Sequence, residues 1–256
     1  MGWLDRCYQT YEKNVAQVGK PSASIRFGWD APTLLPVAHT TQKVNVEVSL
    51  SGSGEFLSAR ILRSDEMTTV IPCTEESSAR TSGPVPHLLV DKLQYIAGDY
   101  IAWGGAKKPM WTEYLVQLQA WCDSPFGLEP VRAVLTYLKK GRLIQDLVSY
   151  RILFADESGH LLKKWTGSKE ETPAVFQSIP NGDQFEAFVR FQVDGNALSS
   201  DPVVWNSYTQ YYLSTLEHTG ICYIQGKEMP VSLLSPYKIR NAGDRAKLIS
   251  SNDSSN

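Results

Sequence analysis

The sequence predicts an α+β protein, an irregular mixed domain with antiparallel hairpins and several packed helices. Apolar and polar residues alternate from Gln42 to Leu50 and resume after a Gly-Ser-Gly turn, which is typical of a β-hairpin. Several later segments instead repeat their apolar residues at the spacing of an α-helix. Strand-like and helix-like segments follow one another without the regular order of a parallel sheet, so we assign the α+β class.

The first predicted element is an amphipathic helix over residues 3–17. Its apolar side chains fall on one helical face: Trp3, Leu4, Cys7, Tyr8, Tyr11 and Val15. Two prolines, Pro21 and Pro32, then bracket a loop-rich entry into β structure.

The hairpin is the clearest β signal in the chain. Its first strand places four apolar side chains on one face: Val44, Val46, Val48 and Leu50. Gly52-Ser53-Gly54 forms the turn, and the second strand runs from Phe56 to Leu62. Val70-Ile71 predicts another short strand.

An exposed loop is predicted next, over residues 74–86. The segment is rich in Ser, Thr, Pro and Gly and contains Arg80-Thr81-Ser82-Gly83. A helix is predicted directly after it, from Leu88 to Ala97, with Gly98 as its C-terminal stop.

Two helices are predicted in the middle of the chain. The first carries apolar residues at helical spacing: Trp111, Leu115, Leu118 and Cys122. The second runs from Leu128 to Leu138 and ends at Lys139-Lys140-Gly141. Strands are then expected at residues 150–154 and 185–193.

The last predicted helix runs from Asp201-Pro202 through His218. Asp caps the helix and Pro occupies its first turn. Its aromatic face is expected to carry Val204, Tyr208, Tyr211 and Tyr212. A short apolar strand follows within residues 220–226.

Residues 227–256 are predicted to form a basic, irregular tail. Its cations are Lys238, Arg240, Arg245 and Lys247. They stand beside one acid, Asp244, and a Ser/Asn string follows. We expect this tail to dock onto a larger assembly.

Composition narrows the class of protein. The 256 residues carry a net charge of −2, so the chain is not basic as a whole, although a local basic face is compatible with this value. The cysteines form no C-x-x-C pair, which argues against zinc and disulfide frameworks, and each is expected to be a small buried hydrophobe: Cys7, Cys73, Cys122 and Cys222. There is no apolar run of eighteen residues and no signal-peptide pattern at the N-terminus. We expect a cytoplasmic protein without a membrane partner or a cofactor.

Catalytic patterns are weak. None of the histidines lies in a nucleophile signature, and Gly104 to Lys108 lacks the spacing of a P-loop. The acids that a metal-dependent nuclease would need show no gathering pattern, and Asp91 is interpreted as a favourable acid in the first turn of a helix. These acids are Asp91, Asp99, Asp183 and Asp194. We do not expect an enzyme.

Nucleic-acid binding has more support. Cations gather in three tight clusters at predicted turns and element ends: Lys107-Lys108, Lys139-Lys140 with Arg142, and Lys163-Lys164. Any single pair is better explained as a solvated surface, but three clusters together favour phosphate contacts. The loop around Arg80 differs in kind, because small residues can enter a groove and Arg can bind a guanine edge with two hydrogen bonds.

Several blocks together resemble a known family. Residues 80–83 and 86–98 resemble the N-terminal part of the large subunit of the type I-C CRISPR surveillance complex, Cascade. Residues 220–228 and 243–252 look like two further blocks of that family in the same order, and the helix over residues 3–15 resembles its opening.

The resemblance also implies how the chain is organised. Family members are about twice as long, which fits two large domains. We therefore expect residues 1–256 to form the N-terminal domain, divided near residues 1–105 and 106–226, and the helical C-terminal domain to be absent. Tyr237 stands where the family usually has a histidine, so no role is carried over for that residue.

By resemblance, the subunit is non-catalytic. It would lie beside the crRNA, recognise the protospacer-adjacent motif on duplex DNA, help to open the duplex and engage the helicase-nuclease and other Cascade subunits. We assign motif recognition to Arg80, Thr81, Ser82 and Gly83, and phosphate contacts to the three cationic clusters. A phage anti-CRISPR inhibitor is a further candidate ligand. The alternatives are a structural scaffold that reads no bases and a metal-dependent nuclease.

Overall fold

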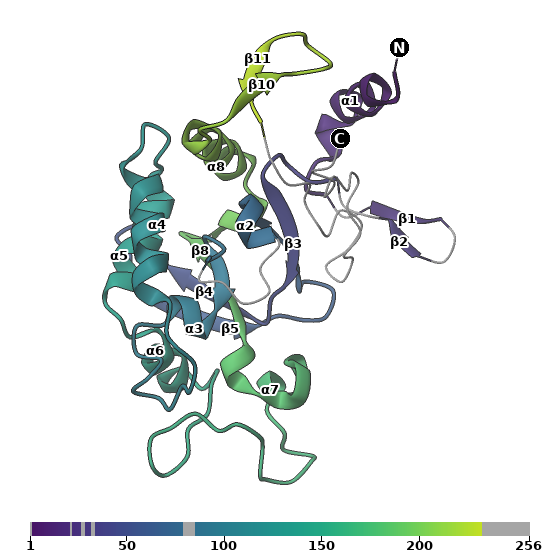
Figure 1. Ribbon diagram of the computed structural model, residues 1–256. Helices are drawn as coiled ribbons and strands as arrows, with labels where there is room; N and C mark the ends of the chain where they lie inside the picture. The colour runs from purple at the N-terminus through teal and green to yellow at the C-terminus, as the bar shows by residue number, and fades with distance from the viewer. Residues whose placement is uncertain (1, 21, 27–28, 32–33, 79–84, 232–256) are drawn as a thin grey trace, which may run out of the picture.

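The computed structural model describes residues 2–20, 22–26, 29–31, 34–78 and 85–231, and the chain is α+β as expected (Figure 1). The strands are β1 (Ser22–Arg26), β2 (Trp29–Ala31), β3 (His39–Lys43), β4 (Val46–Leu50), β5 (Phe56–Ile61), β6 (Thr68–Pro72), β7 (Val90–Lys92), β8 (Phe188–Val193), β9 (Asn196–Ala197), β10 (Thr219–Ile221) and β11 (Glu228–Pro230). The helices are α1 (Trp3–Lys13), α2 (Glu75–Ser78), α3 (Leu93–Ile96), α4 (Trp111–Asp123), α5 (Glu129–Lys139), α6 (Leu143–Ser149), α7 (Ala174–Ser178) and α8 (Pro202–Thr215).

The central sheet is built around the predicted hairpin. Strands β4 and β5 pair antiparallel, and the sheet order is β5-β4-β8-β7, with β9 paired to β8. The β4–β8 pair is parallel, and it joins segments about 140 residues apart through register partners such as Val48 and Phe191. Alternation puts Val46, Val48 and Leu50 on one fully buried face of β4, as predicted.

The alternating stretch from Gln42 to Leu50 is nevertheless not one strand. Residues up to Lys43 belong to β3, which pairs with β6 in a separate two-stranded sheet. The chain changes sheets at Val44 and Asn45, whose amides bond to Met67 and Phe188. Val44 is still fully buried, so the apolar pattern reports burial correctly but not strand continuity.

Helices α4 and α5 stack beside the apolar face of the sheet (Figure 1). Tyr137 of α5 reaches Phe191 of β8 with 6.4 Å between ring centroids. Gly54 in the hairpin turn lies against α5 so closely that a Cβ atom there would be 2.7 Å from the carbonyl oxygen of Ala133. The predictions of α4, α5 and the hairpin are thus confirmed, and one cluster of buried side chains extends from Val44 to Tyr208.

The predicted helix from Leu88 to Ala97 is wrong over its first half. Val90–Lys92 forms strand β7, which pairs with β8, and only Leu93–Ile96 is helical. The carboxylate of Asp91 is fully buried and accepts bonds from the amides of His87 and Lys92, both at 2.8 Å. Pairing with a distant strand therefore outweighs the local helical spacing, and Asp91 is not an acid in a helical first turn.

The predicted strand at residues 150–154 is also wrong. Helix α6, which the sequence reasoning missed, ends just before this segment at Ser149, and the chain then turns at Arg151, which has a positive φ of 57°. The backbone of Phe154 bonds to the Leu162 amide and to a side chain, and it does not join a strand. The buried Gln184 accepts from its amide and donates to its carbonyl oxygen, both at 2.9 Å.

Other predictions hold with shifted ends. Helix α8 begins as predicted, with Asp201 accepting from the Val203 amide at 2.8 Å, but it ends at Thr215, before His218. Strand β8 begins at Phe188, three residues after its predicted start.

The loop predicted over residues 74–86 is not wholly exposed, because it contains helix α2 with buried Ser77 and Ser78. Of the four cysteines, Cys73 and Cys122 are buried as expected, whereas Cys7 is exposed and Cys222 is half-buried.

Part of the predicted irregular tail is a strand instead. Strands β10 and β11 pair antiparallel, so residues 228–230 are not irregular. Residues 232–256 lie outside the described residues. Within the described ranges, no helix is both long and apolar enough to cross a bilayer.

Candidate nucleic-acid interface

The loop from Gly98 to Lys108 is where the cationic segments meet. Gly98 approaches the turn after α5 so closely that a Cβ atom there would lie 2.8 Å from the Cα atom of Gly141. The Trp103 carbonyl accepts from the amide of Leu161 at 3.0 Å, which fastens residues 155–165 to the same loop. The structure therefore brings all three predicted clusters onto segments that contact one another.

The carboxylate of Asp99 strengthens this junction. It accepts from the amides of Ile144 and Gln145, at 3.2 and 2.8 Å, at the start of α6. An acid at a helix start satisfies amides that have no partner within the helix. Burial raises the pKa of Asp99, although the two amides act in the opposite direction.

The first cluster is partly neutralised. Lys107 pairs with Glu186 at 2.5 Å, and Lys92 of β7 pairs with the same carboxylate. The hydrogen bond to Glu186 raises the pKa of Lys107. Lys108 is 75% exposed and lies 3.9 Å from Glu113, so its ammonium group is available to solvent.

In the second cluster, two cations pair with carboxylates and one does not. Lys140 pairs with Glu55 at 2.7 Å, and Arg142 pairs with Asp146 at 3.0 Å. Lys139 instead donates to the side-chain amide oxygen of Gln119 at 2.6 Å, and no carboxylate neutralises it within the described part of the chain.

The third cluster is the most open. Lys163 and Lys164 are both exposed, and neither has an ion-pair partner among the residues that the structure describes. The neighbouring Trp165 packs against Phe154 and Phe176 with centroid distances of 6.1 and 5.7 Å. The aromatic contacts anchor the base of this segment and leave its lysines in water.

The remaining predicted site residues lie outside the described residues. They are Arg80, Thr81, Ser82 and Gly83 of the motif loop and Lys238, Arg240, Arg245 and Lys247 of the tail.

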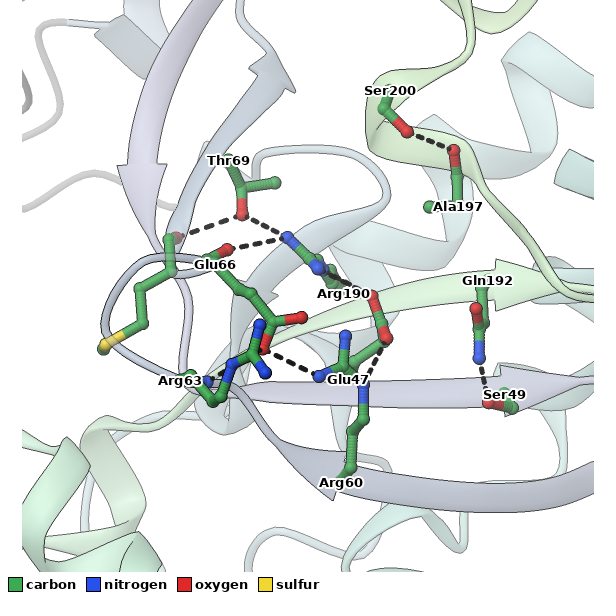
Figure 2. Close-up of polar contacts among 11 residues, drawn as sticks. Glu47, Ser49, Arg60, Arg63, Glu66, Thr69, Arg190, Gln192, Ala197 and Ser200 are labelled. Carbon is green, nitrogen blue, oxygen red and sulfur yellow. Dashed lines mark hydrogen bonds and ion pairs between the residues drawn. The ribbon is translucent and has the colours of Figure 1, made fainter. Parts of the chain in front are cut away.

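A second charged group, which sequence reasoning missed, lies on the other face of the sheet (Figure 2). Glu47 of β4 has a side chain only 4% exposed and binds Arg60 of β5 at 2.8 Å and Arg190 of β8 at 2.7 Å. Arg190 also donates to the carbonyl oxygen of Glu66 and the hydroxyl of Thr69, so it connects the central sheet to β6. A signal was present, because Glu47 occupies a position between the apolar residues of the predicted strand.

Charge is balanced in this second group. Three arginines face three carboxylates, since Arg63 lies 3.4 Å from both Asp65 and Glu66. The hydrogen bond from Arg60 lowers the pKa of Glu66 to about 2. The group has no surplus positive charge for phosphate and is best explained as a structural connection.

Comparison with known proteins then gives the family. A family model described as CRISPR-associated protein (Cas_Csd1) matches residues 7–256. The chain belongs to this family. It is the family of the type I-C Cascade large subunit, as the sequence blocks had indicated. No curated protein matches the chain.

In this Cas_Csd1 chain, the acids considered for a metal site have structural contacts. Each accepts a hydrogen bond from a backbone amide: Asp91, Asp99, Asp183 and Asp194. Within the described ranges, no three His, Cys, Asp or Glu side chains gather as a metal site.

Proposed function

We propose that this chain is the non-catalytic, DNA-binding part of the Cascade large subunit. In this proposal it recognises the protospacer-adjacent motif on duplex DNA, aids duplex opening and contributes to recruitment of the helicase-nuclease. Family membership supports a role in a crRNA-guided complex with other Cascade subunits. It also supports the cytoplasm as the expected compartment.

The observation that carries the proposal is the convergence of the three cationic clusters on one loop. Within the described residues, four of the seven cations pair with a carboxylate, namely Glu186, Glu113, Glu55 or Asp146, and three do not, so these clusters carry more cations than partner carboxylates. Such excess attracts the phosphate backbone without regard to sequence. Phosphate contacts of this kind set the position of a protein on a duplex.

Motif recognition is assigned to the loop of Arg80, Thr81, Ser82 and Gly83. Its composition supports the assignment, because small side chains allow close approach and Arg provides a planar pair of donors for guanine. The basic tail is assigned to docking on crRNA or on partner subunits. An anti-CRISPR inhibitor that blocks this surface is a further proposal.

The test uses the complete complex with its crRNA, titrated against duplexes with and without the motif at several salt concentrations. Changing Lys139→Gln together with Lys164→Gln should weaken binding to both duplexes. It should also reduce the salt slope, which is the slope of the logarithm of the binding constant against the logarithm of the salt concentration, by about 2, since each phosphate contact contributes about 0.9. Arg80→Ala should instead remove the preference for the motif. Lys13→Gln, on exposed α1, is the matched control and should change neither quantity.

A scaffold that reads no bases is the second candidate. It predicts normal assembly and an unchanged salt slope in the double lysine variant. It also predicts that Arg80→Ala leaves discrimination between the two duplexes intact. Either result would refute the corresponding part of the proposal.

A further inference from the structure

A cavity of about 540 Å³ is lined by residues of α2, of the C-terminal half of α8 and of the segments that flank the β10–β11 hairpin. Figure 1 shows where these elements lie. Three tyrosines of α8 form one wall: Tyr208, Tyr211 and Tyr212. Leu216 and Val231 add apolar surface. Its volume is within the range of about 300–1,000 Å³ that is usual for ligand sites.

The described residues that line the cavity include several acids, unlike the three cationic clusters. Glu75 and Glu76 of α2 line it, together with Glu217 just after α8. Among the described residues, His218 also lines the cavity, and neither lysine nor arginine does. The three carboxylates among the described lining residues attract a cation and oppose a phosphate group.

The tyrosine wall is pre-organised. The rings of Tyr208 and Tyr212 stack with centroids 6.2 Å apart and planes 4° from parallel. Tyr208 packs edge-on against Trp121 at 5.2 Å, and the hydroxyl of Tyr212 accepts from the Glu75 amide at 3.2 Å. Aromatic faces next to carboxylates provide both cation–π and ionic attraction.

We propose that this cavity binds an arginine side chain presented by a basic segment of a partner protein in the complex. A guanidinium group fits the site better than an ammonium group, because its planar form can stack on a tyrosine ring while its N–H groups reach a carboxylate. A protein is the expected source, since the family's complex contains other protein subunits and the acidic lining opposes phosphate.

The first test measures the chemistry of the site. N-acetyl-arginine amide is titrated into the full chain and followed by NMR, with the citrulline amide as the uncharged counterpart. Saturable shifts should appear for the arginine amide alone. Glu76→Gln combined with Glu217→Gln should weaken its binding by about tenfold or more, because a charge-assisted hydrogen bond is lost. Both side chains are exposed, so folding should be preserved.

Glu129→Gln serves as the control, because Glu129 is 90% exposed and lies on α5 outside the cavity lining. It should bind the arginine amide like the unchanged chain. Equal shifts with the arginine and citrulline amides would overturn the proposal. So would an undiminished affinity in the double glutamate variant.

The second test identifies the source of the arginine. The other Cascade subunits, assembled with crRNA, are titrated with the full chain, and its retention is measured. The double glutamate variant should associate about tenfold more weakly, whereas Glu129→Gln should associate normally. Unchanged association would overturn the assignment to a partner protein.

A third test asks whether the basic tail of this chain occupies the cavity. It uses a variant in which four tail residues are changed to Gln: Lys238, Arg240, Arg245 and Lys247. If it binds the arginine amide more tightly than the unchanged chain, then this chain's own tail competes for the cavity and the partner proposal is overturned. Equal binding supports a partner.

Discussion

The two charged regions of this protein use their ions in opposite ways. On the sheet, Glu47 is almost completely buried and bonds to two arginines, one of them 143 residues away along the chain. In the cationic clusters, Lys108 and Lys164 are exposed to water. The comparison teaches that a buried charge must be matched by a partner and then serves the fold, whereas a surface charge in excess stays available for a ligand.

Removing the buried carboxylate should have the largest effect. Glu47→Ala leaves Arg190, only 12% exposed, without its ionic partner, so the free energy of unfolding should fall by about 3–5 kcal/mol. Urea denaturation measures the loss. Glu129→Ala, at a 90% exposed position, should change stability by less than about 0.5 kcal/mol. A loss of similar size in both variants would abolish the distinction between buried and surface charge.

A buried group without a charged partner should show the next largest effect. Burial lowers the pKa of His39 to about 4, against an ordinary value of 6.5, although the Val37 carbonyl acts in the opposite direction. Between these values the unfolded chain binds more protons than the folded chain. The stability contribution is therefore complete above pH 6.5 and is lost as the pH falls to 4, by about 3 kcal/mol.

Denaturation at a series of pH values measures the slope of the unfolding free energy against pH. His39→Gln should flatten it between pH 6.5 and 4, and His160→Gln, at an exposed position, should leave it unchanged. The explanation fails if the slope survives in the His39 variant.

The smallest effect should come from a surface carboxylate. Glu55→Gln removes the partner of Lys140, and because the lysine is then free for phosphate, duplex affinity of the complex should rise by roughly two- to fivefold. Fluorescence anisotropy at low salt measures the change. Glu129→Gln provides the charge-matched control, and an equal gain there would show that only net charge matters.

Local patterns predicted much of this fold. The hairpin, α4, α5 and α8 follow from residue spacing and helix-start chemistry within a single segment. The errors share a different cause. Strand β7 depends on pairing with β8, and the backbone of Phe154 depends on the Gln184 side chain, so neither is determined by nearby residues.

The candidate site shows the same division. Adjacent lysines are visible in the sequence, and their clusters were predicted. Their convergence was not, because it depends on tertiary contacts such as Gly98 with Gly141 and Trp103 with Leu161. The pairing of Lys107 with Glu186 and of Lys140 with Glu55 likewise appears only in three dimensions.

The parallel pairing of β4 with β8 has a consequence for biosynthesis. Glu47 leaves the ribosome 143 residues before Arg190. At translation speeds of about 5–20 residues per second, roughly 7–30 s separate the two. During that interval the β4–β5 hairpin is complete in sequence, but β4 lacks the strand that covers its other edge. The nascent chain therefore exposes an unpaired strand edge, on which Glu47 has Arg60 but not yet Arg190 as a partner. A translational pause between β5 and β8 would prolong the time during which this edge can aggregate.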